Sequence, residues 1–245
     1  MTRGEQISVK RVTVEALAVV LSILLAFAID AAWDARNDRA SEIASLQSLL
    51  SELQANRAVF EAGSAAHEGL RMRTKTLFDI SRGVEDLPED DAAMSRLHLR
   101  SFRSHYITDY RSGALNALLA SGDFGLLRAQ DLKIALAAWP TLVEDALENE
   151  RMVSRWVEER LIPYAVETTP ACIFTVPVPV LTSADYERCR AELNEILGSD
   201  RLEGLLAHKL WLYQSTLEEF ERLRGSFDDL NGLLQRELAG RQSDL

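Results

Sequence analysis

The residues of this sequence that could carry chemistry are two cysteines, four histidines and one arginine-rich stretch. Cys172 and Cys189 lie 17 positions apart in the part of the chain that looks least helical. In an oxidising compartment this spacing favours a disulfide that closes a loop, whereas in a reducing one the two side chains would be buried thiols. A loop of this length would contribute about 3 kcal/mol through loop entropy.

The arginine-rich stretch has two interpretations. Its basic side chains could bind an anion or an acidic partner, or they could be solvated helix faces that pair with the acidic remainder of the chain. His98 and His105, seven positions apart, would align on one helix face, but no further His or Cys completes a recognisable metal set. We predict no metal, and the possible patch comprises Arg96, Arg100, Arg103 and Arg111.

No pattern of a known catalytic site is present in the sequence. The segment GALNALLASGDFGLL, residues 113–127, pairs a small-residue helix with glycines. It lacks the strand, the lysine and the glycine spacing of a phosphate loop. A nucleophile elbow and a metal-hydrolase motif are also missing. The sequence therefore predicts no catalytic residue, no cofactor and no enzymatic activity.

Composition indicates a helical and acidic protein. The chain has 245 residues, only six prolines and twelve glycines, and a formal net charge of -11. Residues 1–11 carry three basic side chains and one acidic one, which leaves -13 for residues 12–245. This acidic balance argues against nucleic acid as a partner.

One segment has the length and composition of a membrane helix. Residues 12–33 would span about 33 Å as a helix, enough for the hydrocarbon core of a bilayer. Glu15 and Asp30 lie near its two ends, about 60° apart in azimuth. Either each carboxylate meets headgroup water, or both face a partner helix, because ionisable groups in membrane helices often mark assembly.

The charge distribution around this segment predicts its orientation. The basic leader, residues 1–11, would stay in the cytoplasm, and the bulk of the chain would lie in the periplasm of a bacterium, anchored in the inner membrane. A cleaved signal peptide is the alternative, because Ala26-Phe27-Ala28 has the small-x-small form of a cleavage site.

Beyond the membrane segment, the apolar spacing predicts an all-α bundle. Residues 34–82 would form a stalk continuous with the membrane helix and the first bundle helices, with Arg57 in its apolar seam. Middle helices would fill 83–161, with Pro140 kinking or dividing one of them. A proline-rich loop would cover 162–182, and C-terminal helices 183–240. The two long amphipathic helices would pack antiparallel, as in a coiled coil.

Two parts of the sequence together resemble a family of uncharacterised single-pass bacterial membrane proteins. In these, an apolar helix ending at a tryptophan continues into a long helix, and a Leu-x-x-Ser-Gly turn follows later. The resemblance implies this topology and transfers no activity. The matching residues are Glu15, SILLAFAID, Trp33, Arg36, Glu42, Leu46, Leu50, Glu52-Leu53 and Asn56 in the first part, and GALNALLASGDFGLL with Asp131-Leu132 in the second.

Two functions are compatible with this architecture. The favoured one is a non-enzymatic membrane-anchored module that oligomerises or binds another envelope protein. The alternative is an extracytoplasmic sensor of a small acid, with a pocket near the proline-rich loop and the arginine-rich stretch. With so short a cytoplasmic leader, a sensor would act as an accessory subunit of a membrane partner.

Overall fold

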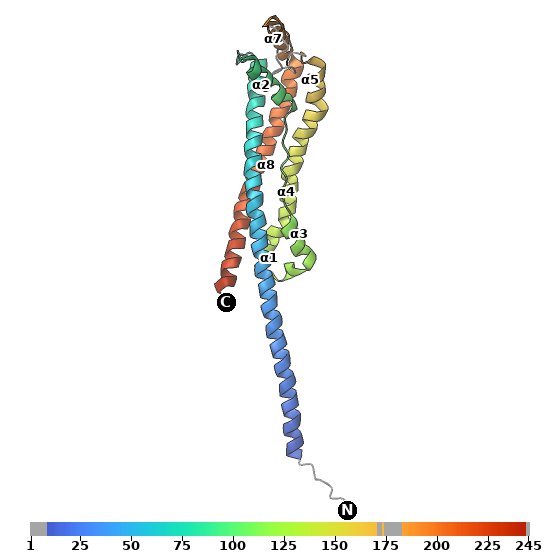
Figure 1. The fold of residues 1–245 in the computed structure, drawn as a ribbon, viewed down its shortest axis with the longest axis vertical. Helices are drawn as coiled ribbons and strands as arrows, with labels where there is room; N and C mark the ends of the chain where they lie inside the picture. Colours follow the sequence, from blue (N-terminus) through green and yellow to red (C-terminus); the bar gives the residue numbers. More distant parts are fainter. Residues whose placement is uncertain (1–8, 171–172, 174–182, 244–245) are drawn as a thin grey trace, which may run out of the picture.

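The computed structural model describes residues 9–170, 173 and 183–243, and all regular elements in these ranges are helices. The chain forms an elongated bundle that stands on one protruding helix (Figure 1). The predicted all-α fold is confirmed, as is the antiparallel packing of the long N-terminal helix against the long C-terminal helix.

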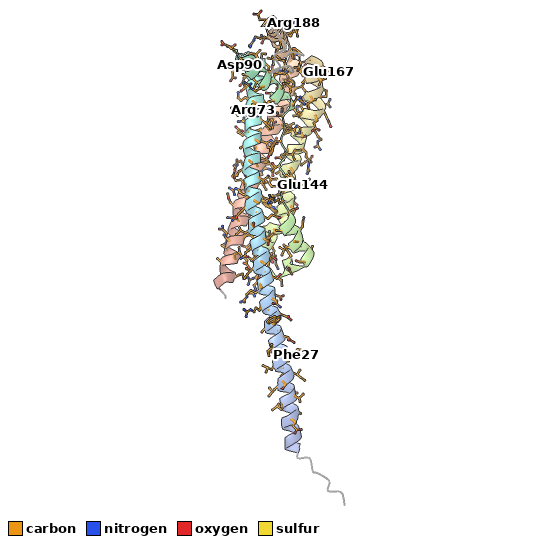
Figure 2. All side chains as sticks on the ribbon, viewed as in Figure 1. Phe27, Arg73, Asp90, Glu144, Glu167 and Arg188 are labelled. Atoms are coloured by element: carbon orange, nitrogen blue, oxygen red, sulfur yellow. The ribbon has the colours of Figure 1, made fainter. Side chains whose placement is uncertain are left out.

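The first helix, α1, runs without interruption over Val9–Ser81 and contains no proline. It continues through Gly63, where the sequence would have permitted a break, so stalk and first bundle helix are one element. The side chains of residues 15–38 are all exposed. α1 is the one described helix long and apolar enough to cross a membrane, with a mean hydropathy of 2.3 over its best window. Phe27 projects freely from this part (Figure 2).

The last helix, α8 (Asp200–Ser243), lies antiparallel to the C-terminal half of α1. Buried positions on both helices alternate by three and four residues, the spacing of a coiled-coil seam. The Phe60 ring of α1 lies 5.3 Å from that of Phe220 and 5.2 Å from that of Phe227. At the end of the bundle nearest the protruding part of α1, Glu42 and Arg241 form an ion pair with both side chains only 4% exposed.

The third long helix, α4 (Gln130–Trp156), packs on α8 and is not divided at Pro140. The proline is exposed to solvent, while Leu136 and Trp139 on the same turn are buried and anchor the helix. A π-helical turn, η2 (Val157–Leu161), and a short helix, α5 (Ile162–Thr168), follow directly. Helix therefore extends into the range predicted as a loop, residues 162–182. Pro163, the second residue of α5, is accommodated by the π-helical turn directly before it.

Shorter helices complete the ends of the bundle. α2 (Asp91–Arg103) is capped by Asp90, which accepts a hydrogen bond from the Ala93 N–H at 2.6 Å. α3 (Gly113–Ser121) closes at Gly122, whose φ of 81° ends the helix before the 3₁₀ turn η1 (Asp123–Gly125). α7 (Ser183–Leu197) precedes α8 at the distal end of the bundle, farthest from the protruding part of α1 (Figure 1).

Candidate functional site

An extended segment, residues 104–112, joins α2 to α3 and runs lengthwise through the bundle between α1 and α4. It occupies the place where a four-helix bundle would have its fourth helix. An extended chain cannot satisfy its own backbone polar groups, so neighbouring elements must supply the partners. The buried polar side chains of the three long helices meet this need.

A cluster of three residues from three elements holds the middle of the segment. We call it the mid-bundle cluster: His67 of α1, Thr108 of the segment and Glu150 of α4. Glu150 is fully buried and accepts hydrogen bonds from the Thr108 N–H and hydroxyl, both at 2.6 Å. The His67 Nε2 lies 2.9 Å from the same carboxylate. One carboxylate therefore ties two helices and the segment together.

The surroundings of the mid-bundle cluster are aromatic. His67 makes edge contacts with Tyr106, Tyr213 and Phe220 at centroid distances of 5.4 to 5.9 Å. Burial, and then the nearby Glu150 carboxylate, raise the pKa of Tyr110. The cluster also separates the two apolar cores of the bundle, a distal one reaching Leu70 and a proximal one reaching Phe60.

Three further anchors fix the rest of the segment. Asn56 of α1 pairs with the backbone of Arg111 through both its amide oxygen and its amide nitrogen, at 2.8 and 2.7 Å. Glu52 of α1 accepts from the Ala114 N–H at 2.7 Å and so caps α3 from a distant element. Lys209 of α8 is buried and donates to the carbonyl oxygens of Ser101 and Ser104, and burial lowers the pKa of its ammonium to about 7.

The close approach of the segment to α1 depends on Gly63. A methyl group at this position would lie 2.5 Å from the Thr108 Oγ1, so either the segment or the helix would have to shift. We expect Gly63→Ala to lower the free energy of unfolding by about 1–3 kcal/mol, in a chemical denaturation followed by circular dichroism.

Gly69→Ala on the same helix is the matched control for this prediction. Its nearest neighbour would be the Arg73 guanidinium at 3.7 Å, which leaves room for a methyl group. Helix propensity then favours the alanine by up to about 1 kcal/mol. Equal effects of the two substitutions would show that the segment does not lie against Gly63.

The mid-bundle cluster is built to hold a structure rather than to react. Glu150 and His67 are both inaccessible to solvent, and the carboxylate already accepts three hydrogen bonds. A reacting group needs room for a substrate within hydrogen-bonding distance. Within residues 9–170, 173 and 183–243, no three His, Cys, Asp or Glu side chains gather closely enough to hold a metal ion.

The predicted arginine patch is divided by the structure. Arg96, Arg100 and Arg103 are exposed on α2, and Arg96 lies 3.7 Å from the Asp90 carboxylate. Arg111 lies at the other end of the extended segment, up to about 25 Å further along the chain. The four arginines therefore do not form one site.

The two histidines of this stretch, His98 and His105, lie in different environments. His98 is buried with its Nε2 2.9 Å from the Thr169 hydroxyl, whereas His105 is partly exposed, 3.6 Å from Glu158. Burial lowers the pKa of His98 to about 4 from an ordinary value of 6.5. The pair shares no ligand position.

Burial of His98 makes an acid-dependent contribution to stability. Between pH 4 and 6.5 the unfolded chain binds a proton at this site that the folded chain does not bind, so acidification favours unfolding. We expect this residue to remove roughly 3 kcal/mol of stability as the pH falls through this window. Denaturation at a series of pH values should show that the free energy of unfolding falls less steeply with decreasing pH in His98→Leu than in the unsubstituted protein. An unchanged slope would contradict the buried neutral imidazole.

The remaining predicted residues are placed as follows. Glu15 and Asp30 are both exposed on the protruding part of α1. Cys189 is buried in the distal core, while Cys172 lies outside the described residues, so their disulfide stays a prediction. The two sequence parts that carry the family resemblance do meet, because Glu52 accepts a hydrogen bond from the Ala114 N–H.

A surface groove lies at the distal end of the bundle, farthest from the protruding part of α1. This distal groove, of about 490 Å³, runs between the η2–α5 stretch and the beginning of α8. The Trp156 indole N–H donates to the Leu205 carbonyl oxygen at 3.3 Å, and the Arg201 guanidinium lies over the Tyr164 ring at 5.1 Å. The groove is lined by Trp156, Glu159, Arg160, Pro163, Tyr164, Glu167, Arg201 and Leu205.

Sequence reasoning predicted no anchoring role for these polar residues, because it derived the helix packing from apolar residues. Asn56, His67 and Lys209 all occupy buried seam positions, seven residues from buried apolar ones such as Leu49, Phe60 and Leu202. A polar residue in register with an apolar heptad was the available signal.

Comparison of the chain with protein-family models, with curated proteins and with solved structures finds no match.

Proposed function

We propose that this protein is a membrane-anchored helical module that oligomerises or binds another envelope protein, without catalysis. The observation that carries the proposal is the protruding half of α1. Its large apolar side chains, including Leu21, Leu25 and Phe27, are between 50 and 66% exposed, and no other described element covers them. Such a surface is stable in hydrocarbon and unstable in water.

The proposed location is the inner membrane of a bacterium, with the bundle in the periplasm. The basic residues before the span, Arg3, Lys10 and Arg11, outnumber Arg36 and Arg39 just after it, which supports this orientation. Because α1 is continuous from the apolar part to Ser81, the bundle would stand at a fixed height above the bilayer. An anchor of this kind presents a rigid surface to other envelope proteins.

The proposed Cys172–Cys189 disulfide fits the same compartment. A bridge would join the proline-rich stretch to α7, whose Cys189 is already buried in the distal core. Protein isolated with thiols blocked by alkylation should migrate faster on a gel without reductant than with it. Identical mobility under both conditions, with two alkylated cysteines found by mass spectrometry, would show that the disulfide does not form.

The absence of catalysis is supported by the use of the buried polar groups. Glu52, Asn56, Glu150 and Lys209 all bind the backbone of residues 101–114, so their chemistry is structural. The test is chemical crosslinking in intact membranes, followed by purification and mass spectrometry. The proposal predicts a self-crosslinked species or one reproducible envelope partner. A monomer without either would contradict it.

The alternative function is an extracytoplasmic ligand sensor that signals through a membrane partner. One observation favours it: the distal groove is of suitable size for a small ligand and includes Pro163 and Tyr164 from the predicted proline-rich stretch. None of the four arginines predicted as a patch lines this groove.

A further inference from the structure

The distal groove lies beside an irregularity in the α4–α5 helix. Pro163 has no N–H to donate to the carbonyl group of Glu159, and its ring would clash with that group in a regular α-helix. The chain accommodates it by widening into the π-helical turn η2 just before the proline. Such turns occur frequently at functional sites, since they displace side chains from the regular helical register.

The charged side chains of the distal groove differ from those nearby on the same helix. Arg151 and Arg155, one to two turns earlier, form ion pairs with Glu144 and Glu148 at 2.5 and 2.7 Å. In the groove, by contrast, two acidic and two basic side chains make no ion pair or hydrogen bond to any described residue. These four side chains are Glu159, Arg160, Glu167 and Arg201.

The apolar part of the groove is held in place. Trp156 is fixed by its hydrogen bond to Leu205 and by the His208 ring, whose centroid lies 4.0 Å from that of the indole. Tyr164 is buried, with its hydroxyl 3.1 Å from the Ser199 Oγ. Two ordered aromatic side chains thus lie beside charges of both signs.

We propose that the distal groove binds a free α-amino acid with an apolar side chain. The ligand carboxylate would pair with Arg160 and Arg201, because guanidinium groups match carboxylates in charge and geometry. Its ammonium group would pair with Glu159 or Glu167. Its side chain would pack on the half-buried Trp156.

A zwitterion fits this set of groups better than a simple acid does. A simple acid would pair with the two arginines but would offer no cation to Glu159 and Glu167. The volume of about 490 Å³ lies within the usual range for small-molecule sites. The inference would identify the ligand class for the alternative function, and it does not depend on the orientation in the membrane.

The test is isothermal titration calorimetry on the full-length protein in detergent micelles with L-phenylalanine as the probe. We expect saturable binding, and at least about tenfold weaker binding of 3-phenylpropanoate and 2-phenylethylamine, which lack the ammonium and the carboxylate respectively. Absence of binding at about 10 mM L-phenylalanine, or equal binding of either analogue, would overturn the proposal.

Variants assign the binding to the groove. The double substitution of Arg160→Gln and Arg201→Gln should weaken L-phenylalanine binding at least about tenfold, with unchanged circular dichroism. The control pair, Arg151→Gln and Arg155→Gln, removes two paired guanidiniums of the same helix and should leave the affinity unchanged. Equal losses of affinity in the two double variants would show that L-phenylalanine does not bind in the distal groove. Failure here would leave the anchored module intact, because crosslinking tests that function separately.

Discussion

Replacing Glu150 by alanine is expected to lower the free energy of unfolding by about 3–5 kcal/mol. The substitution leaves the Thr108 N–H, the Thr108 hydroxyl and the His67 Nε2 without a partner in a place that water does not reach. It also removes the one group that joins α1, α4 and the extended segment. Chemical denaturation of the full-length protein in detergent, followed by circular dichroism, measures the effect.

Glu144→Ala is the control for this prediction. Glu144 is an exposed partner of Arg151 on the same helix, and loss of such a surface pair changes stability by less than about 1 kcal/mol. A cycle with His67→Ala should show coupling, because each single substitution already breaks the same hydrogen bond. Similar small effects of Glu150→Ala and Glu144→Ala would contradict the role of the mid-bundle cluster.

The second large effect concerns the apolar half of α1. Substituting arginine for both Leu21 and Leu24 places two charges near the middle of the proposed span, at a cost of about 2.5–3.5 kcal/mol each. We expect the protein to disappear from carbonate-washed membranes, either because it no longer inserts or because it is degraded. Membrane fractionation and immunoblotting measure this change.

The matched control places the same charges beyond the span. Gln47 and Gln54 are exposed positions of α1 that lie alongside the bundle, so arginines there face water. This control pair should remain in the membrane fraction at the normal level. If the Leu21 and Leu24 variant also remains there, the apolar segment is not what holds the protein in the membrane.

The long helices could be predicted from the sequence, because burial on them follows the heptad spacing of apolar residues. The spacing of apolar residues by threes and fours predicts a seam of Ile43, Leu46, Leu50, Leu53 and Phe60 on α1. Leu46, Leu53 and Phe60 are buried, whereas Ile43 and Leu50 are half-buried. The assignment of Arg57 to that seam was wrong. Asn56 takes the buried position, while Arg57 reaches the surface and pairs with Asp228 at 2.6 Å.

The extended segment and its anchors could not be predicted in this way. Residues 104–112 are held by side chains far away in the sequence, such as Asn56 and Glu150, and local spacing contains no information about such contacts. The end of α3 could be predicted, since Gly122 is a local signal. The π-helical turn before Pro163 was missed, because a proline after a helix usually indicates its end.

The most direct test of the anchored module is the side of the membrane on which the bundle lies. The C-terminus of the full-length chain can be fused to alkaline phosphatase, which is active only outside the cytoplasm. A second fusion carries green fluorescent protein, which fluoresces in the cytoplasm but stays dark when the general secretion route exports it. The account predicts an active phosphatase fusion and a dark fluorescent fusion, both retained in carbonate-washed membranes. A fluorescent fusion with inactive phosphatase would place the bundle in the cytoplasm and contradict it.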